Sequence, residues 1–127
     1  MISISKKFQK TINNKINFEG VGLHSGLKSK LTLHPAPVNY GINFVINKTT
    51  IPAHSNYVDS TLRSTNLLKN KNSIMTVEHL LSALYALEVN NLKIEVSECE
   101  IPILDGTSKM FFDEITRIGL KDQNEKC

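Results

Sequence analysis

The sequence has little cysteine and no long apolar run. Only two of its 127 residues are cysteine. Cys99 and Cys127 form no recognisable spacing, so neither a structural disulfide nor a secreted scaffold is expected. No stretch approaches the roughly 20 apolar residues of a membrane-spanning helix. Residues 1–17 contain neither acid nor arginine, and strand-like alternation begins at Ile12, so a removable leader is not expected. These absences favour a cytoplasmic protein.

An excess of charge of one sign is also absent. Fifteen lysines and arginines oppose twelve acidic residues, for a net charge of +3, and the longest basic clusters are at residues 5–7 and 69–71. A nucleic-acid-binding surface usually has denser basic clusters with interleaved aromatic residues. No nucleic-acid partner is therefore expected, although a basic domain that binds RNA stays open as an alternative.

Repeats and Pro/Gly/Ser-rich linkers are missing, so nothing divides the chain, and residues 1–127 are expected to form one domain. The apolar content of 40% and charged content of 21% are ordinary for a globular protein. A chain of this length can bury about two-thirds of its unfolded surface, so a stable core does not require disulfides or a structural metal.

Hydrophobic periodicity predicts several strands and two helices. Period-two alternation predicts strands at residues 12–18, 28–33, 41–47, 58–68 and 92–96. A 3.6-residue period predicts helices at residues 77–88 and 108–118, with Gly119 in the C′ position of the second. This order predicts an α+β two-layer sandwich, a mostly antiparallel sheet with two helices on one face. The polar segment 121–127 is typical of an interdomain linker or an interrupted reading frame.

The clearest candidate for chemistry is the pair Glu78 and His79. It sets a carboxylate beside an imidazole in the first turn of the expected helix, with Ser73 and Thr76 available as caps. The helix dipole favours a negative charge there, as a general base requires, and imidazole is a common zinc ligand. The pair is also compatible with an acidic residue that only stabilises the helix start, beside a solvated histidine.

Histidine is too scarce for a complete metal site. His24, His34 and His54 are the only others, and no H-x-x-x-H or H-x-x-x-D spacing occurs. A catalytic zinc usually takes three protein ligands. A complete zinc site within this chain is therefore not expected.

Two turns also carry polar residues. Residues 20–26 read G-x-G-x-x-x-G and precede a strand, not a helix, which argues against a dinucleotide site and favours a hairpin with glycines at positive φ. His24 at its tip could touch a ligand. In residues 100–108, Asp105 could orient a catalytic group, or the segment could simply cap the second helix through Asp105, Thr107 or Ser108. Residues 58–65 fit a half-buried strand.

Four segments together resemble one family. They are residues 20–26 (GVGLHSG), 31–37 (LTLHPAP), 76–80 (TVEHL) and 100–106 (EIPILDG). In order and spacing they resemble the first domain of UDP-3-O-acyl-N-acetylglucosamine deacetylase, which performs the committed step of lipid A synthesis in Gram-negative bacteria. The resemblance runs from about residue 8 to residue 120.

The resemblance implies two similar α+β domains with the active site between them, and a zinc hydrolase that removes acetate from the sugar nitrogen. It implies that Glu78 is the general base and that His79 is the first Zn²⁺ ligand. Asp105 would support the site from nearby. The substrate, UDP-3-O-acyl-N-acetylglucosamine, would be bordered by three residues: His24, Leu62 and Ser64.

The chain departs from the family in extent. The family's other zinc ligands, a further histidine and most of the acyl-chain tunnel belong to a second domain, which would lie beyond Cys127. One imidazole cannot hold zinc in a catalytic geometry. The chain alone is therefore expected to be inactive and to need a second domain, for example one encoded separately. The alternative is a non-catalytic remnant or binding module with the same fold.

Overall fold

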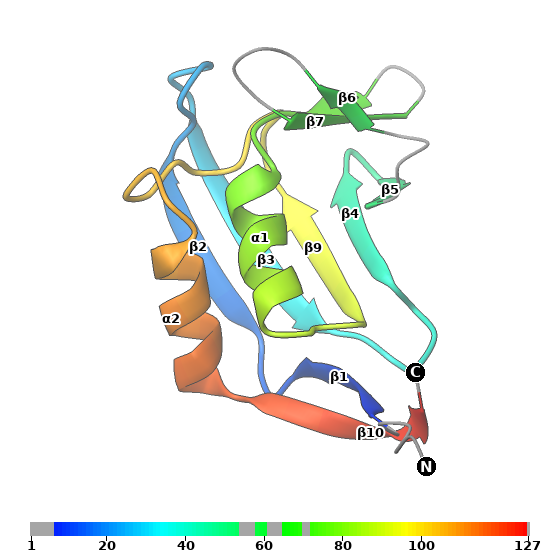
Figure 1. The fold of residues 1–127 in the computed structure, drawn as a ribbon. Coiled ribbons are helices and arrows are strands. Elements are labelled where there is room, and N and C mark those ends of the chain that lie inside the picture. The colour runs from blue at the N-terminus through cyan, green and yellow to red at the C-terminus, as the bar shows by residue number, and fades with distance from the viewer. Residues whose placement is uncertain (1–6, 54–57, 61–64, 70–71, 127) are drawn as a thin grey trace.

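The computed structural model describes residues 7–53, 58–60, 65–69 and 72–126. Its centre is a five-stranded sheet covered on one face by two helices, α1 (Glu78–Ala86) and α2 (Lys109–Ile118) (Figure 1). The strands lie in the order β2 (Ile16–Val21), β3 (Lys28–Pro35), β9 (Leu92–Val96), β4 (Ile42–Ile46) and β5 (Thr49–Pro52). Neighbours are antiparallel except β4 and β9. The predicted α+β sandwich is confirmed.

The core lies between the sheet and the helices. Period-two alternation buries one face of the sheet, so that Leu31 and Leu33 of β3 lie beside Ile94 of β9. The helices contribute residues spaced three or four apart, which are Leu80, Ala83 and Leu84 from α1 and Phe111 and Ile115 from α2. Both helices and the buried faces follow the predicted periodicity.

Two smaller sheets lie at opposite ends of the sandwich (Figure 1). β6 (Val58–Ser60), β7 (Thr65–Lys69) and β8 (Asn72–Ile74) form an antiparallel sheet at the end where α1 begins. β1 (Phe8–Ile12) and β10 (Leu120–Lys126) pair antiparallel at the other end.

Two predicted strands are each divided. The strand expected at residues 12–18 is interrupted between β1 and β2, where the backbone N–H of Asn13 donates to the carbonyl of Gly119 at 3.0 Å. This bond ties the bend to the end of α2. The strand expected at residues 58–68 is β6 and β7, which are antiparallel partners. The two short strands β5 and β8 have too few residues for a periodic signal.

The polar segment at residues 121–127, typical of a linker or an interrupted reading frame, is a strand over the residues that the structure describes. Residues 120–126 are β10, although most of the strand is exposed and polar. Backbone pairing with β1 holds it. Gln123 adds two side-chain bonds, donating to the Ala36 carbonyl at 2.8 Å and accepting from the Asn91 amide at 2.7 Å.

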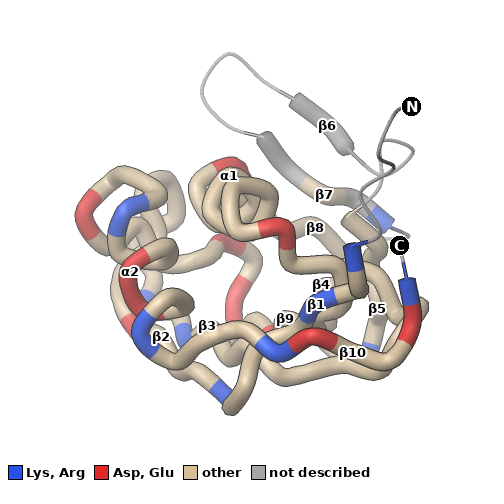
Figure 2. Tube along the Cα trace, turned by 60° about the horizontal axis from the view of Figure 1, so that its bottom comes forward, with Lys and Arg blue, Asp and Glu red and all other residues tan. Residues whose placement is uncertain are grey.

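Charged residues are mixed in sign, and the described helices are short. Lysine, arginine and acidic residues are interspersed along the described chain (Figure 2). None of the described helices combines the length and the apolar character that crossing a membrane requires.

Candidate functional site

Glu78 and His79 form the first turn of α1, where the sequence predicts them. Their side chains are 33% and 30% exposed, and His79 Nε2 lies 4.0 Å from Glu78 Oε1. Both are therefore accessible and close enough to act on one ligand. The start of the helix also directs the positive end of its dipole toward this turn, which favours negative charge there.

A groove beside α1 includes Glu78 in its wall. It has a volume of about 520 Å³, and its lining is apolar or aromatic except for Glu78 and Ser82, the other members being Ile42, Ala53, Leu81, Leu84, Tyr85 and Val89. A carboxylate beside an apolar wall is suited to a ligand with both polar and apolar parts.

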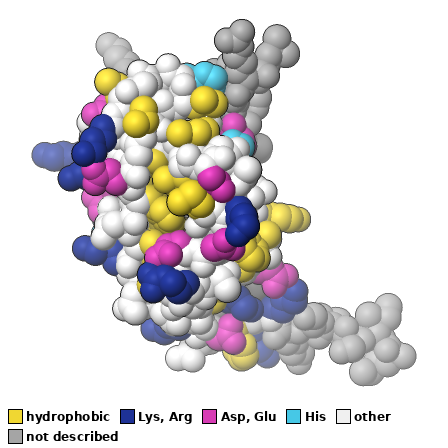
Figure 3. All heavy atoms as spheres, turned by 90° about the vertical axis from the view of Figure 1, so that its left-hand side faces the viewer, with side chains coloured by type: hydrophobic (Ala, Val, Ile, Leu, Met, Phe, Trp, Pro, Cys, Tyr) yellow, Lys and Arg dark blue, Asp and Glu magenta, His cyan; other side chains and the backbone are white. Residues whose placement is uncertain are grey.

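A second hollow lies on the face formed by α2 and β2, where apolar side chains gather among charged ones (Figure 3). Phe18 and Met110 line it together with Asn17, Asp113 and Glu114, around about 290 Å³. It contains neither Glu78 nor His79, so the candidate site is the groove at α1.

Glu100 is a buried carboxylate whose role the sequence pattern did not predict. It is 0% exposed, and of the residues that the structure describes it is the one charged side chain in the buried set. Its Oε1 accepts from the backbone N–H of His24 at 2.9 Å and of Ser25 at 2.7 Å, and its Oε2 accepts from the Thr76 hydroxyl at 2.5 Å. Burial raises the pKa of Glu100, but the hydrogen bonds from Thr76, Ser25 and His24 outweigh it and hold the pKa below the usual glutamate value.

The predicted caps of α1 are wrong. Ser73 lies within β8, and the N-cap residue is Val77, which makes no side-chain capping bond. The Thr76 hydroxyl donates to Glu100, and the Thr76 backbone has a φ of +64°. This conformation is unfavourable for a β-branched residue. The turn before Glu78 therefore depends on a distant carboxylate, not on a local cap.

The glycine-rich turn is the predicted hairpin between β2 and β3. Of its three glycines only Gly26 has the expected positive φ, +67°, so that part of the prediction is wrong for Gly20 and Gly22. At Gly22 the requirement is space, because a Cβ there would lie 2.4 Å from Glu100 Oε1 and 2.5 Å from Ser25 Oγ. Glycine at residue 22 therefore allows the turn to close over the carboxylate.

We expect Gly22→Ala to destabilise the protein by about 1–3 kcal/mol, because the added methyl group must displace Glu100 from its hydrogen bonds. Urea unfolding followed by circular dichroism measures this. Gly26→Ala is the control: it adds backbone strain of about 1–2 kcal/mol, but its Cβ meets nothing within 4 Å. Crystal structures of the two variants separate the causes, since only Gly22→Ala should move the Glu100 side chain. An unmoved Glu100 in Gly22→Ala would contradict the steric explanation.

The other predicted site residues have mixed outcomes. His24 is exposed in the β2–β3 loop, and its backbone N–H donates to Glu100.

Asp105 accepts from the Thr107 backbone N–H at 3.1 Å and from the Thr107 hydroxyl at 3.0 Å. The backbone N–H bond holds the pKa of the Asp105 carboxyl below its usual value. Asp105 shapes the turn before α2, whose N-cap, Ser108, makes no side-chain capping bond. Support of the site by Asp105 stays a prediction. Leu62 and Ser64 lie outside the described residues.

The histidines do not gather around His79 in the described part of the chain. His34 contacts Glu95 through its Nε2 atom, on strands β3 and β9. His54 lies outside the described residues. Residues 7–53, 58–60, 65–69 and 72–126 contain no group of three or more His, Cys, Asp or Glu side chains placed to hold a metal ion. His79 can offer one nitrogen ligand, so these residues fit part of a zinc site and do not complete one.

Comparison with known proteins gives a consistent match. The family model described as UDP-3-O-acyl N-acetylglycosamine deacetylase matches residues 9–127. The chain is 45% identical over 118 residues to the UDP-3-O-acyl-N-acetylglucosamine deacetylase of Aquifex aeolicus, covering 93% of this chain and 42% of that protein. The enzymes of the same name from Hahella chejuensis and Teredinibacter turnerae are 45% and 42% identical, each over 91% of this chain and 40% of theirs. The chain thus spans about two fifths of the length of these relatives.

Proposed function

The chain belongs to the UDP-3-O-acyl N-acetylglycosamine deacetylase family, and from this membership we propose that it forms part of a deacetylase of lipid A biosynthesis. The substrate is UDP-3-O-acyl-N-acetylglucosamine. Water cleaves the amide C–N bond on the sugar, which releases acetate and leaves an amine. The observation that carries the proposal is the Glu78–His79 pair, partly exposed at the start of α1, with Glu78 in the wall of an apolar groove.

In this proposal each member of the pair has one role. Glu78 is the general base that takes a proton from the attacking water, because its carboxylate is accessible at a helix start. His79 supplies one ligand to Zn²⁺ through an imidazole nitrogen. Zinc, when bound, lowers the pKa of water and polarises a carbonyl group. Asp105, His24, Leu62 and Ser64 keep their predicted roles around the substrate.

In this proposal a second domain, on the same chain or separately encoded, supplies the other zinc ligands, because the described residues offer only part of a zinc site. The length of the relatives supports this, since the chain covers about two fifths of them. Residues 1–127 then form one domain that is inactive alone. The free thiol of Cys99 supports a cytoplasmic location.

The test compares the full-length protein that contains this chain with residues 1–127 alone. We expect the full-length protein to release acetate from UDP-3-O-acyl-N-acetylglucosamine, and the 127-residue chain to release none above background. A chelator should abolish the activity and remove one zinc per molecule, measured by elemental analysis, and added Zn²⁺ should restore it.

Two results would contradict this proposal. Full-length protein that binds the UDP-sugar without hydrolysing it would indicate a binding module with the same fold. Hydrolysis by residues 1–127 alone would show that the site is complete without a second domain.

A further inference from the structure

One buried carboxylate joins the glycine-rich turn to the segment that leads into α1. Glu100 accepts from the glycine-rich turn at His24 and Ser25 and from the hydroxyl of Thr76, two residues before Glu78. We propose that Glu100 is a positioning residue that holds this turn and the start of α1 in one arrangement around the Glu78–His79 pair. The effect on turnover rests on the proposed function, whereas the effect on local structure does not.

The backbone around Glu100 is bonded to both neighbours. On one side, the Met75 N–H donates to the Cys99 carbonyl at 2.7 Å, and the Ile101 N–H donates to the Met75 carbonyl at 3.3 Å. On the other side, the Ile103 N–H donates to the Val21 carbonyl at 2.8 Å. The β2–β3 loop, the segment after β9 and the start of α1 accordingly meet at one end of the sandwich (Figure 1). Glu100 lies where these three segments converge.

The side chain adds what these backbone bonds do not provide, a fixed conformation at Thr76. This residue is buried with a φ of +64°, which a threonine rarely adopts. Its hydroxyl bond to Glu100 opposes relaxation of that backbone. If the backbone relaxed, the first turn of α1 would rotate, and Glu78 and His79 would change direction together.

The glycine-rich turn depends on the same atoms. The backbone N–H groups of His24 and Ser25 point at Glu100 Oε1, and Gly22 leaves the space for that oxygen. Loss of the carboxylate would leave these donors without their acceptor and free the turn that carries His24. A single substitution at Glu100 should therefore disturb the glycine-rich turn and the start of α1 at once.

Glutamine and alanine at residue 100 should differ in a diagnostic way. A glutamine oxygen can accept from Ser25 and His24, and its amide can donate to the Thr76 hydroxyl, so Glu100→Gln can keep the arrangement. Glu100→Ala removes every acceptor. Glu98→Gln is the control, because it removes a charge two residues away, at a side chain that is not fully buried.

The experiment uses the full-length protein and two measurements. Amide hydrogen exchange is followed in residues 22–27, in residues 75–79 and in β9, and kcat and KM are measured for deacetylation. For Glu100→Ala we expect exchange to rise at least tenfold in the first two segments and not in β9. We also expect kcat to fall by about tenfold to a hundredfold, as displaced catalytic groups do. In Glu100→Gln, the exchange rates of the two segments and kcat should both lie close to the wild-type values. Glu98→Gln should match the wild type in both measurements.

Other outcomes overturn the inference. Unchanged exchange in residues 22–27 and 75–79 of Glu100→Ala would show that the carboxylate does not hold these segments. Faster exchange throughout, β9 included, would show a general loss of stability. Faster local exchange with unchanged kcat and KM would show that the arrangement does not serve turnover. If the wild type has no deacetylase activity, the proposed function fails, while the exchange data still test whether Glu100 holds the two segments.

Discussion

Replacing Glu78 with glutamine in the full-length protein is expected to lower kcat for deacetylation by about 10²–10⁴-fold, the usual contribution of a general base. Glutamine has nearly the same shape as glutamate but cannot take a proton from water. Because the change leaves His79 in place, the zinc content and KM should stay close to the wild-type values. Steady-state kinetics with elemental analysis of the same samples measures all three quantities.

The control for Glu78→Gln is Glu88→Gln, just beyond the other end of α1. Glu88 is exposed and pairs with Lys7 at 2.6 Å. An exposed ion pair of this kind contributes little to the stability of the fold. The Glu88→Gln protein should therefore keep its kcat. A Glu78→Gln protein with kcat within threefold of the wild type would exclude Glu78 as the base, and a loss of zinc from it would indicate a role in metal binding instead.

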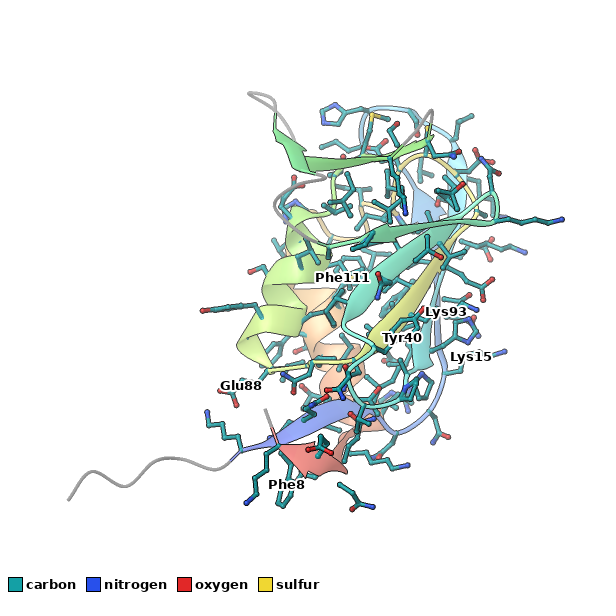
Figure 4. The ribbon with its side chains drawn as sticks, turned by 90° about the vertical axis from the view of Figure 1, so that its right-hand side faces the viewer. Phe8, Lys15, Tyr40, Glu88, Lys93 and Phe111 are labelled. Atoms are coloured by element: carbon teal, nitrogen blue, oxygen red, sulfur yellow. The ribbon has the colours of Figure 1, made fainter. Side chains whose placement is uncertain are left out.

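Replacing Phe111 with alanine is expected to destabilise the 127-residue chain by about 3–5 kcal/mol, as measured for large-to-small changes in cores. Phe111 is 0% exposed and lies between the helices and the sheet (Figure 4). Its ring meets Phe18 of β2 edge to face, with centroids 5.0 Å apart. The change would leave a cavity and remove an aromatic contact between the two layers. Urea unfolding of the variant and the wild type measures the difference.

Phe112 provides the matched control for Phe111. It is the next residue of α2 and the same amino acid, but it is 38% exposed. Phe112→Ala should therefore lower the free energy of unfolding much less than Phe111→Ala does. Equal losses from the two substitutions would contradict the layer packing described for α2, because the two side chains would then contribute alike.

Local patterns in the sequence predict the helices and the buried faces. Apolar residues four apart place Leu80 and Leu84 on one side of α1. Apolar residues two apart place Leu31 and Leu33 on one face of β3. In both elements the apolar residues lie on the one face that is buried. The same helix prediction places Glu78 and His79 together in a first turn, without reference to any tertiary contact.

Features set by distant partners were not predictable in this way. The hydrogen-bond partners of Glu100 lie 76, 75 and 24 residues away, so a glutamate in a loop gave no local sign of burial. The sequence predicts Thr76 as a helix cap because a cap needs only a hydroxyl close to the helix start. Local sequence does not reveal that the Thr76 hydroxyl bonds to the distant carboxylate of Glu100 instead. β10 has no alternation, since its conformation follows from the backbone of β1.

The pairing of β1 with β10 also constrains how the chain folds during synthesis. Phe8 pairs with Lys126, so nearly the whole domain separates the two strands in sequence. β2 and β3, by contrast, are sequence neighbours and can pair early. On the ribosome, β1 emerges before β10 and lacks this partner until β10 follows it out of the exit tunnel. Such non-local pairing is slow to form, and meanwhile the open edge of β1 is available to other nascent chains or to a chaperone.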